Sequence, residues 1–364
     1  MKKALLLAAL ATAVVAIAVP VANAAQRVAA AKGAVYTITN AATGNGVAYF
    51  SRDAAGALSL VATYAAGGNG TGANLGSQGA VALSDGGKLL FAVNAGSDSI
   101  SEFAVREDGG LKLLSTFSSN GALPTSLTIH KNLLYVLDAG GAGSITGYKV
   151  DGQGGVELLA TATQPLLGAG PAQVAFSPNG SELVVTEKGT STLDTFEVGS
   201  HGYAQPGISS PSAGGTPFGF QFDSLGRVFV SEAAGSASSY TVDALGAHTI
   251  SGAVVTHQAA PCWLVVTPDG RWAYTANAGA GTISGFSIAP DGSIALLDTS
   301  GATGSFGAGS HPLDEAVSTD GQFLYVLVDG HHTIGGFRIN ADGSLTVLGE
   351  VGTLPAGAVG LAAS

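Results

Sequence analysis

The sequence predicts an all-β protein, a β-propeller of seven blades with four antiparallel strands in each. The first observation is a repeat of about 45 residues built of short strands and glycine turns, which is typical of propeller blades. It recurs six times, with cores at residues 90–105, 134–150, 183–198, 228–242, 272–288 and 324–339. The second observation is that the segments left at the two ends hold the strands of one more blade.

Each copy has the same order of elements. In one of them, an apolar strand at 173–176 meets a tight turn, a second strand at 183–186 leads into a loop, and a third strand follows at 192–198. A fourth strand comes after a polar turn, as at Asp291-Gly292. Because Asp-Gly between alternating apolar residues is a strong hairpin signal, each copy is expected to form a four-stranded meander.

The ends of the chain are expected to pair with each other. Residues 34–66 contain only three strands, and residues 357–363 contain one. Pairing them completes the seventh blade and covers two strand edges that would otherwise be open to aggregation. We therefore expect a lead-in at residues 25–33 and a single propeller domain over residues 34–364.

Residues 1–24 have the features of a secretory signal peptide. Lys2-Lys3 precede an apolar run at 4–19, and Ala22-Asn23-Ala24 forms a cleavage site of the A-x-A type. The apolar run is shorter than the roughly 20 residues that a membrane-spanning helix needs. The sequence thus predicts export to the periplasm or the exterior after cleavage near Ala24, with no membrane span in the mature chain.

Composition restricts the partners. The net charge of −11 argues against nucleic acid, which requires a basic surface. Cys262 is the only cysteine, so no intramolecular disulfide is expected. We expect a monomer whose partner is a small molecule or an extracytoplasmic protein. No cofactor is predicted, and a cation in the channel is left open.

Blade geometry indicates where a site would lie. In a propeller, the loops that enter the innermost strands and the loops between second and third strands emerge on one face, here called the mouth. One residue per blade aligns in the second kind of loop: Asn40, Asn94, Asp138, Glu187, Glu232, Asn277 and Val328. Turn preferences explain Asn and Asp at such positions, but not glutamate. Glu187 and Glu232 are therefore candidate catalytic residues, and Asn94, Asp138 and Asn277 are candidate substrate-binding residues.

The loops that enter the innermost strands add further candidates. Trp263 could form the floor of an apolar pocket together with Phe218. The segment His311-Pro-Leu-Asp314-Glu315 is the richest polar cluster on the mouth side, and His311 could assist proton transfer. A solvated loop is the alternative for this cluster. His331-His332 could bind a transition metal, or be a solvated pair.

Cations are scarce at the mouth. Lys188 is the only basic residue in a mouth loop, and the others fall near hairpin turns of the opposite face or rim. Phosphate and polycarboxylate ligands need cations aimed at them. The mouth is therefore predicted to be acidic, with Asp138, Glu187 and Glu232 converging there and raising the pKa of at least one carboxylate.

The repeats resemble those of exported lactonase-like propellers, which include 6-phosphogluconolactonases of the cycloisomerase type and carboxymuconate-lactonising enzymes. The likeness rests on blades of the form Y-V-x-N-x-G-x-x-x-I-x-x-F-x-I followed by D-G-x-L-x-x-L. The family's glutamate in a V-V-N-E loop matches Glu232. Its P-H-x-H, G-P-R-H and N-R-G strings correspond to Pro171–Val174, Thr216–Gly219 and Asn277–Gly279, which contain neither histidine nor arginine.

Two functions follow as alternatives. The resemblance implies a hydrolase that opens a neutral lactone or cyclic ester at the mouth, with Glu232 or Glu187 as general base and His311 assisting. The other alternative is a non-catalytic propeller that binds a ligand, a cation or a protein.

Signal-peptide cleavage is expected between Ala24 and Ala25, because the small residues of Ala22-Asn23-Ala24 fit the cleavage site. N-terminal sequencing of protein recovered outside the cytoplasm should begin at Ala25. A retained Met1, or recovery in the cytoplasm alone, would contradict the prediction.

Overall fold

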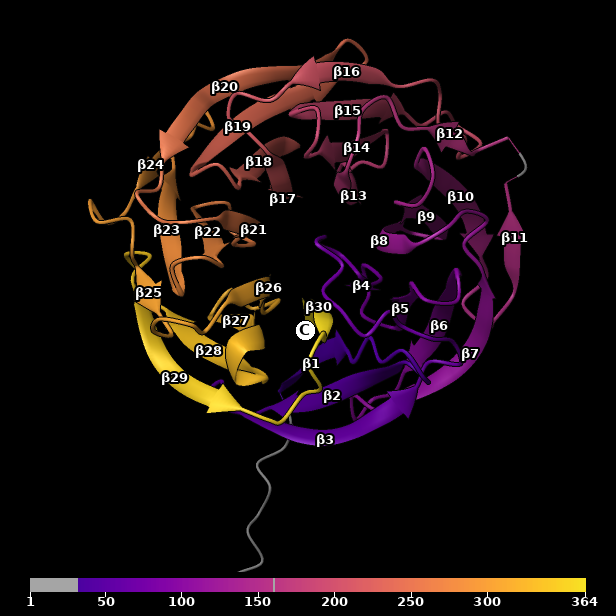
Figure 1. Ribbon diagram of the computed structural model, residues 1–364, viewed down its shortest axis with the longest axis horizontal. Coiled ribbons are helices and arrows are strands. Elements are labelled where there is room, and N and C mark those ends of the chain that lie inside the picture. Colours follow the sequence, from indigo (N-terminus) through magenta and orange to yellow (C-terminus); the bar gives the residue numbers. More distant parts are fainter. Residues whose placement is uncertain (1–31, 160) are drawn as a thin grey trace, which may run out of the picture.

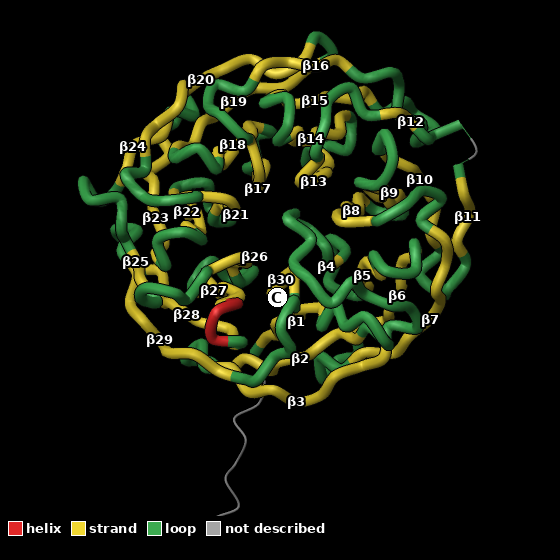
Figure 2. The backbone as a smooth tube through the Cα atoms, viewed as in Figure 1, coloured by secondary structure: helices red, strands yellow, loops and turns green. Residues whose placement is uncertain are grey.

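Seven β-sheets form a closed ring around a central axis in the computed structural model (Figure 1), which describes residues 32–159 and 161–364. The expected signal peptide and most of the lead-in lie outside the described residues. Strands account for nearly all regular structure, with one short 3₁₀ helix, η1 (Asp329–His331), visible in Figure 2. Within the described part of the chain, no helix is long and apolar enough to cross a membrane.

The strands of each blade follow in order from the axis outward. Blade 1 contains β30 (Val359–Ala363), β1 (Gly33–Ile38), β2 (Gly46–Arg52) and β3 (Leu58–Ala65). Blade 2 contains β4 (Val81–Leu83), β5 (Leu89–Asn94), β6 (Ser99–Val105) and β7 (Leu111–Ser118). Blade 3 contains β8 (Pro124–His130), β9 (Leu133–Asp138), β10 (Ser144–Val150) and β11 (Val156–Leu158), with β12 (Gln164–Pro165) also pairing with β10.

The other four blades repeat this plan. Blade 4 contains β13 (Pro171–Phe176), β14 (Glu182–Glu187), β15 (Thr192–Glu197) and β16 (Ile208–Pro211). Blade 5 contains β17 (Pro217–Phe222), β18 (Arg227–Glu232), β19 (Ser236–Asp243) and β20 (Gly246–Val255). Blade 6 contains β21 (Pro261–Val266), β22 (Trp272–Asn277), β23 (Thr282–Ile288), β24 (Ile294–Leu296) and the added β25 (Gly304–Ser305). Blade 7 contains β26 (Pro312–Val317), β27 (Phe323–Val328), β28 (Thr333–Ile339) and β29 (Leu345–Val351).

The predicted seven-bladed fold is confirmed, with β1 beginning one residue before the expected start at residue 34. The second strand of each blade is buried almost throughout, because its sheet packs between two neighbouring blades. Apolar residues alternate with small ones across these interfaces, which form the core clusters.

Buried tyrosines connect neighbouring blades. Each lies on a second strand and donates its hydroxyl hydrogen bond to a backbone carbonyl in the third hairpin of the next blade. The four pairs are Tyr36–Gly109, Tyr135–Gly202, Tyr274–Gly343 and Tyr325–Gly56, with O···O distances of 2.7 or 2.8 Å. Each bond satisfies a phenol that would otherwise be buried without a partner, so packing and register between blades are fixed together.

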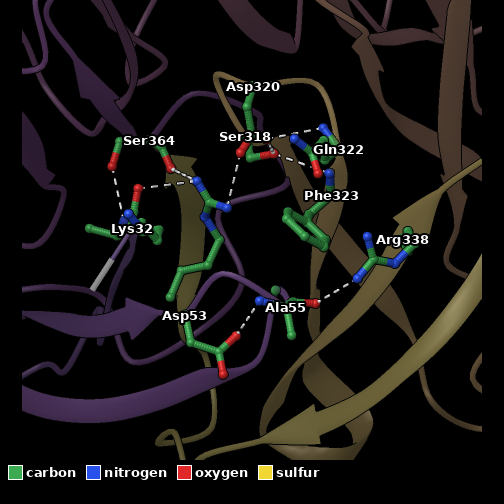
Figure 3. Close-up of polar contacts among 12 residues, drawn as sticks. Lys32, Asp53, Ala55, Ser318, Asp320, Gln322, Phe323, Arg338 and Ser364 are labelled. Atoms are coloured by element: carbon green, nitrogen blue, oxygen red, sulfur yellow. Dashed lines mark hydrogen bonds and ion pairs between the residues drawn. The ribbon is translucent and has the colours of Figure 1, made fainter. Parts of the chain in front are cut away.

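The predicted pairing of the chain ends closes the ring. β30 runs antiparallel to β1, with Val35 opposite Ala363 and Ile38 opposite Val359. Beside this pair, the buried guanidinium of Arg52 forms an ion pair with Asp320 at 3.1 Å and donates to the carbonyl of Ser364 (Figure 3). The two chain ends are therefore joined by backbone pairing within blade 1, and the Arg52–Asp320 ion pair joins blade 1 to blade 7.

Deleting residues 357–364 should lower the Tm of the mature protein by roughly 10 °C or more. The deletion removes β30 and leaves the ladder of β1 exposed along one edge. Differential scanning calorimetry measures the shift. Ala356→Ser, in the exposed turn before β30, is the control and should leave the Tm unchanged. An unchanged melting curve for the deletion would show that β30 does not hold the ring closed.

Candidate functional site

The seven aligned residues at the ends of the second strands are buried, not part of an open rim. Each residue has at most 1% of its surface exposed to solvent. The loop that enters the same blade lies directly over them. A side chain at Gly68, Gly121 or Gly214 would collide with Asn94, Asp138 or Glu232, respectively, and one at Gly168 would lie within 3.0 Å of Glu187. The carboxylates of Asp138, Glu187 and Glu232 are therefore enclosed within the protein and do not form an exposed acidic surface at the mouth.

Glu232 is enclosed by hydrogen-bond donors. Its Oε1 accepts from the backbone N–H of Gly214 at 3.0 Å and from the hydroxyls of Ser212 and Ser238. Its Oε2 accepts from the hydroxyl of Ser236. A carboxylate can accept all of these bonds, so the donors around Glu232 satisfy its oxygens without a neighbouring cation.

Asp138 and Glu187 have the same position but no donors. None of their four carboxyl oxygens has a hydrogen-bond partner among the described residues. Burial raises the pKa of Asp138 to about 7 and that of Glu187 to about 7. The nearby carboxyl of Asp194 raises the pKa of Glu187 further, whereas Lys188 lowers it. The pKa values are thus raised mainly by loss of solvent, and not by repulsion across the mouth.

Asn94 and Asn277 bond to serines on the third strands. Asn94 Nδ2 donates to Ser101 Oγ at 2.8 Å, and Asn277 Nδ2 donates to Ser284 Oγ at 2.9 Å. Ser101 then donates to the carbonyl of Ala66 in the loop that enters blade 2, whereas Ser284 donates to the carbonyl of Gly301, between β24 and β25 of blade 6. This amide–hydroxyl–carbonyl chain holds the entering loop of blade 2 and the outer segment of blade 6 in place, which is a structural role for these two asparagines.

The mouth of the channel is closed by residues 75–79, which here are called the plug. Gln78 Nε2 donates to the carbonyl of Leu264 at 2.8 Å, and its Oε1 accepts from Leu264 N–H at 2.9 Å. Ser77 Oγ donates to the carbonyl of Thr125. Figure 1 shows this loop, just before β4, reaching toward the ring centre. The sequence predicts these residues only as a loop that enters an innermost strand. Among the six such loops, this one alone lacks the proline that the other five share.

Trp263 and Phe218 lie beneath the plug, so they do not form the floor of an open pocket. Trp263 Nε1 donates to the carbonyl of Ser77 at 2.9 Å, and its ring lies 4.9 Å from that of Phe218. The ammonium of Lys188 lies 4.9 Å from the Phe218 ring and donates to the carbonyl of Gly76. Burial lowers the pKa of Lys188. The one mouth lysine thus holds the plug in place.

The cluster around His311 is split by the structure. His311 is exposed in the loop before β26, whereas Asp314 and Glu315 are buried within that strand. Glu315 Oε1 accepts from the N–H of Ala276 in blade 6 at 3.1 Å. Burial raises the pKa of Asp314 to about 7 and that of Glu315 well above its usual range. His311 belongs to blade 7, so it does not share a blade with Glu232.

A cavity of about 590 Å³ occupies the channel on the face opposite the mouth. All seven innermost strands line it, and Gln78 of the plug reaches it from the other side. Its wall contains no lysine, arginine or histidine among the described residues. It contains two acids, Glu315 and Asp223, and Asp223 is neutralised by Arg227 at 2.6 Å. The open hollow suits an uncharged ligand and lies on the face that sequence reasoning did not choose.

The two adjacent histidines do not form a metal site with other residues. Within residues 32–159 and 161–364, no three His, Cys, Asp or Glu side chains are grouped closely enough to hold a metal ion. His331 Nδ1 lies 2.9 Å from Glu350 Oε2 on the surface.

Comparison with protein-family models shows the family to which this chain belongs. The model described as "Lactonase, 7-bladed beta-propeller" matches residues 28–164 and 226–315, and the second range includes Glu232. The chain belongs to this lactonase family. No curated protein matches the chain.

Solved structures agree with this family's fold. A putative 6-phosphogluconolactonase from Bacteroides fragilis is 19% identical, with a TM-score of 0.73, over 91% of this chain and 97% of its own. The periplasmic gluconolactonase of Pseudomonas aeruginosa is 16% identical, with a TM-score of 0.70, over 90% and 98% of the two chains. A functionally unknown protein from Desulfotomaculum acetoxidans is 15% identical, with a TM-score of 0.73. At these identities the likeness concerns the fold alone.

Replacing Asp138 by asparagine should stabilise the protein at pH 8. The folded pKa of about 7 exceeds the unfolded value of 3.8, so the folded state binds the proton more tightly. The stability this proton contributes is complete below about pH 4 and is lost as the pH rises through about 7. Asp138→Asn, which copies Asn94 and Asn277, should therefore gain about 2–4 kcal/mol at pH 8 and little at pH 4.

Urea unfolding at several pH values measures this effect. The variant should lose part of the decline in stability between pH 4 and pH 8 that the parent protein shows. Asp298→Asn, the same exchange at a partly exposed bend of blade 6, is the matched control and should keep the decline. Parallel pH profiles for Asp138→Asn and the parent would show that Asp138 is not protonated in the folded state.

Proposed function

We propose that this lactonase-family propeller is an exported hydrolase that opens a neutral lactone. The observation that carries the proposal is Glu232, a buried carboxylate that accepts hydrogen bonds from Gly214 and Ser236, at the position that the lactonase resemblance assigns to an acid. Structural neighbours named as lactonases support the reaction class. The A-x-A site at Ala22–Ala24 supports action outside the cytoplasm.

The charge around the candidate positions supports a neutral substrate. Lys188 is already bonded to the plug, and the channel cavity has no basic residue in its described wall. A phosphorylated lactone would bring two negative charges to either place without a cation to bind them. An uncharged sugar lactone requires only hydrogen-bonding groups.

In the proposed reaction, Glu232 acts as general base. It accepts a proton from a water molecule whose oxygen attacks the lactone carbonyl, and the ring C–O bond then breaks. The leaving alkoxide takes up the proton, so the product is a hydroxy acid. Gly214 lies against the carboxylate of Glu232, so the loop at 213–215, in which Ala213 is exposed, has to move aside to admit substrate.

One observation favours a second candidate, a non-catalytic binding propeller. The cavity of about 590 Å³ has the size of a small-molecule site, and seven strands hold its wall in place. In that case a neutral ligand would occupy the cavity from the face opposite the mouth, and Glu232 would only pin the loop that covers it.

Glu232→Gln tests the two functions. The parent protein should hydrolyse glucono-1,5-lactone, and the variant should lose about 100-fold or more in kcat/KM, since the amide keeps the shape and loses the base. A pH-stat assay of acid release measures the rate. Glu197→Gln, the same exchange at an exposed position, is the control and should keep the parent rate. The Tm of both variants checks folding.

Other outcomes separate the alternatives. If Glu187→Gln loses the hydrolysis rate and Glu232→Gln keeps it, the general base is Glu187 of blade 4. Absence of turnover in the parent, with binding of intact glucose detected by calorimetry, would support the binding propeller. Absence of both turnover and binding would reject both functions for sugar lactones.

A further inference from the structure

The hairpins between blades 3 and 4 depart from the pattern of the other blades. In the first hairpins, the residue with a positive φ is a glycine in five blades, namely Gly87, Gly180, Gly226, Gly270 and Gly321. Blade 3 has Lys131 there instead, at φ 55°. Since this backbone region disfavours every residue with a side chain, the lysine is held against local preference.

The third hairpins show a second departure at the same place. Six blades have an aspartate in this turn: Asp53, Asp108, Asp151, Asp243, Asp291 and Asp342. Blade 4 has Gly199-Ser200-His201-Gly202. Where the repeat provides an acid, blade 4 thus provides an imidazole and a hydroxyl.

The two departures line one groove. It has a volume of about 400 Å³ and lies between the first hairpin of blade 3 and the first and third hairpins of blade 4. Its basic residues are His130, Lys131, Lys149 and His201, and its wall includes no aspartate or glutamate. In a chain with a net charge of −11, this is a local concentration of positive charge.

The lysines of the groove are available for a ligand. Neither Lys131 nor Lys149 makes a side-chain hydrogen bond or ion pair with the described residues. Arg338 occupies the position of Lys149 in blade 7, and there it donates to the carbonyl of Ala55 in the next blade at 3.1 Å (Figure 3). At the interface between blades 7 and 1 the cation of Arg338 is hydrogen-bonded to the protein. At the interface between blades 3 and 4 the ammonium groups of Lys131 and Lys149 have no such partner among the described residues.

His130 adds an unsatisfied group beside them. Its Nε2 is buried and has no partner among the described residues, and its ring packs 5.9 Å from that of Phe176. Two acids lie just outside the groove: Asp85 is 3.9 Å from His130 Nδ1, and Glu182 bonds to Ser181. The hydroxyl of Ser200 and the amide of Asn132 complete the polar wall.

We propose that this groove binds the oxyanion of a small hydroxylated molecule, either a carboxylate or a phosphate. Two ammonium groups match an oxyanion, and the imidazole, hydroxyl and amide groups match hydroxyls around it. The volume fits a molecule of the size of a sugar acid or sugar phosphate. The site is independent of the proposed hydrolase chemistry, because it lies at the hairpin face and Glu232 lies at the mouth.

Isothermal titration of the mature protein with gluconate, glucose 6-phosphate and glucose tests the proposal. We expect both anions to bind, with affinity falling as salt rises, and glucose not to bind. Lys131→Gly restores the residue of the other first hairpins, so it should fold at least as well as the parent. The double variant Lys131→Gly/Lys149→Ser should bind both anions with an affinity lower than that of the parent by about tenfold or more.

Lys112→Ser, an exposed lysine of β7 outside the groove, is the matched control and should bind both anions as the parent does. A preference for one anion assigns the ligand as a carboxylate or as a phosphate. The proposal is overturned if the parent binds neither anion at millimolar concentration, or if the double variant binds as tightly as the parent. Inhibition of lactone hydrolysis is not part of the readout, so failure here leaves the proposed hydrolase untouched.

Discussion

Pairing of β30 with β1 is the interaction on which the rest of the ring depends. The final strand supplies the innermost edge of blade 1, so the first and last parts of the chain form one sheet. Without it, the axis would lose one of its seven innermost strands, and the cavity its wall at Leu361–Ala363. Arg52 strengthens the same seam by bonding blade 7 and the chain end at once. The same strand therefore closes the ring and completes the wall of the cavity.

Burial of the second strands then determines what polar residues can do at their ends. A side chain at this position lies under the loop that enters its blade, so it must find partners inside the protein. Asn94 and Asn277 do so through serines, and Glu232 does so through hydroxyls and one N–H. Asp138 and Glu187 lack donors, and their raised pKa values keep them largely uncharged at moderately acidic pH. The same repeat position thus holds neutral amides, a hydrogen-bonded carboxylate, and carboxyl groups whose pKa is raised by burial.

The repeat could be predicted from sequence because it depends on local order: strand, turn, strand and polar hairpin. The number of blades and the pairing of the ends followed from counting, and both are confirmed. The plug could not be predicted in the same way, since Gln78 bonds to Leu264, a residue 186 positions away. The burial of Glu232 was missed for a related reason. A glycine such as Gly214 shows that a loop can approach closely, but not what it approaches.

The plug separates the mouth loops, which cover Glu232, from the cavity on the opposite face, although the sequence predicts both to lie along one channel. It lies between the mouth loops and the cavity, with Gln78 bonded across the axis and Lys188 holding Gly76. A ligand in the cavity would therefore enter from the hairpin face, whereas the proposed lactone substrate would reach Glu232 beneath the loop at 213–215. Both places lack a free cation, and the unused lysines gather instead in the groove between blades 3 and 4. If the proposed hydrolysis takes place, the uncharged lactone becomes an anion, so the proposed substrate and its product would suit different surfaces of the same ring.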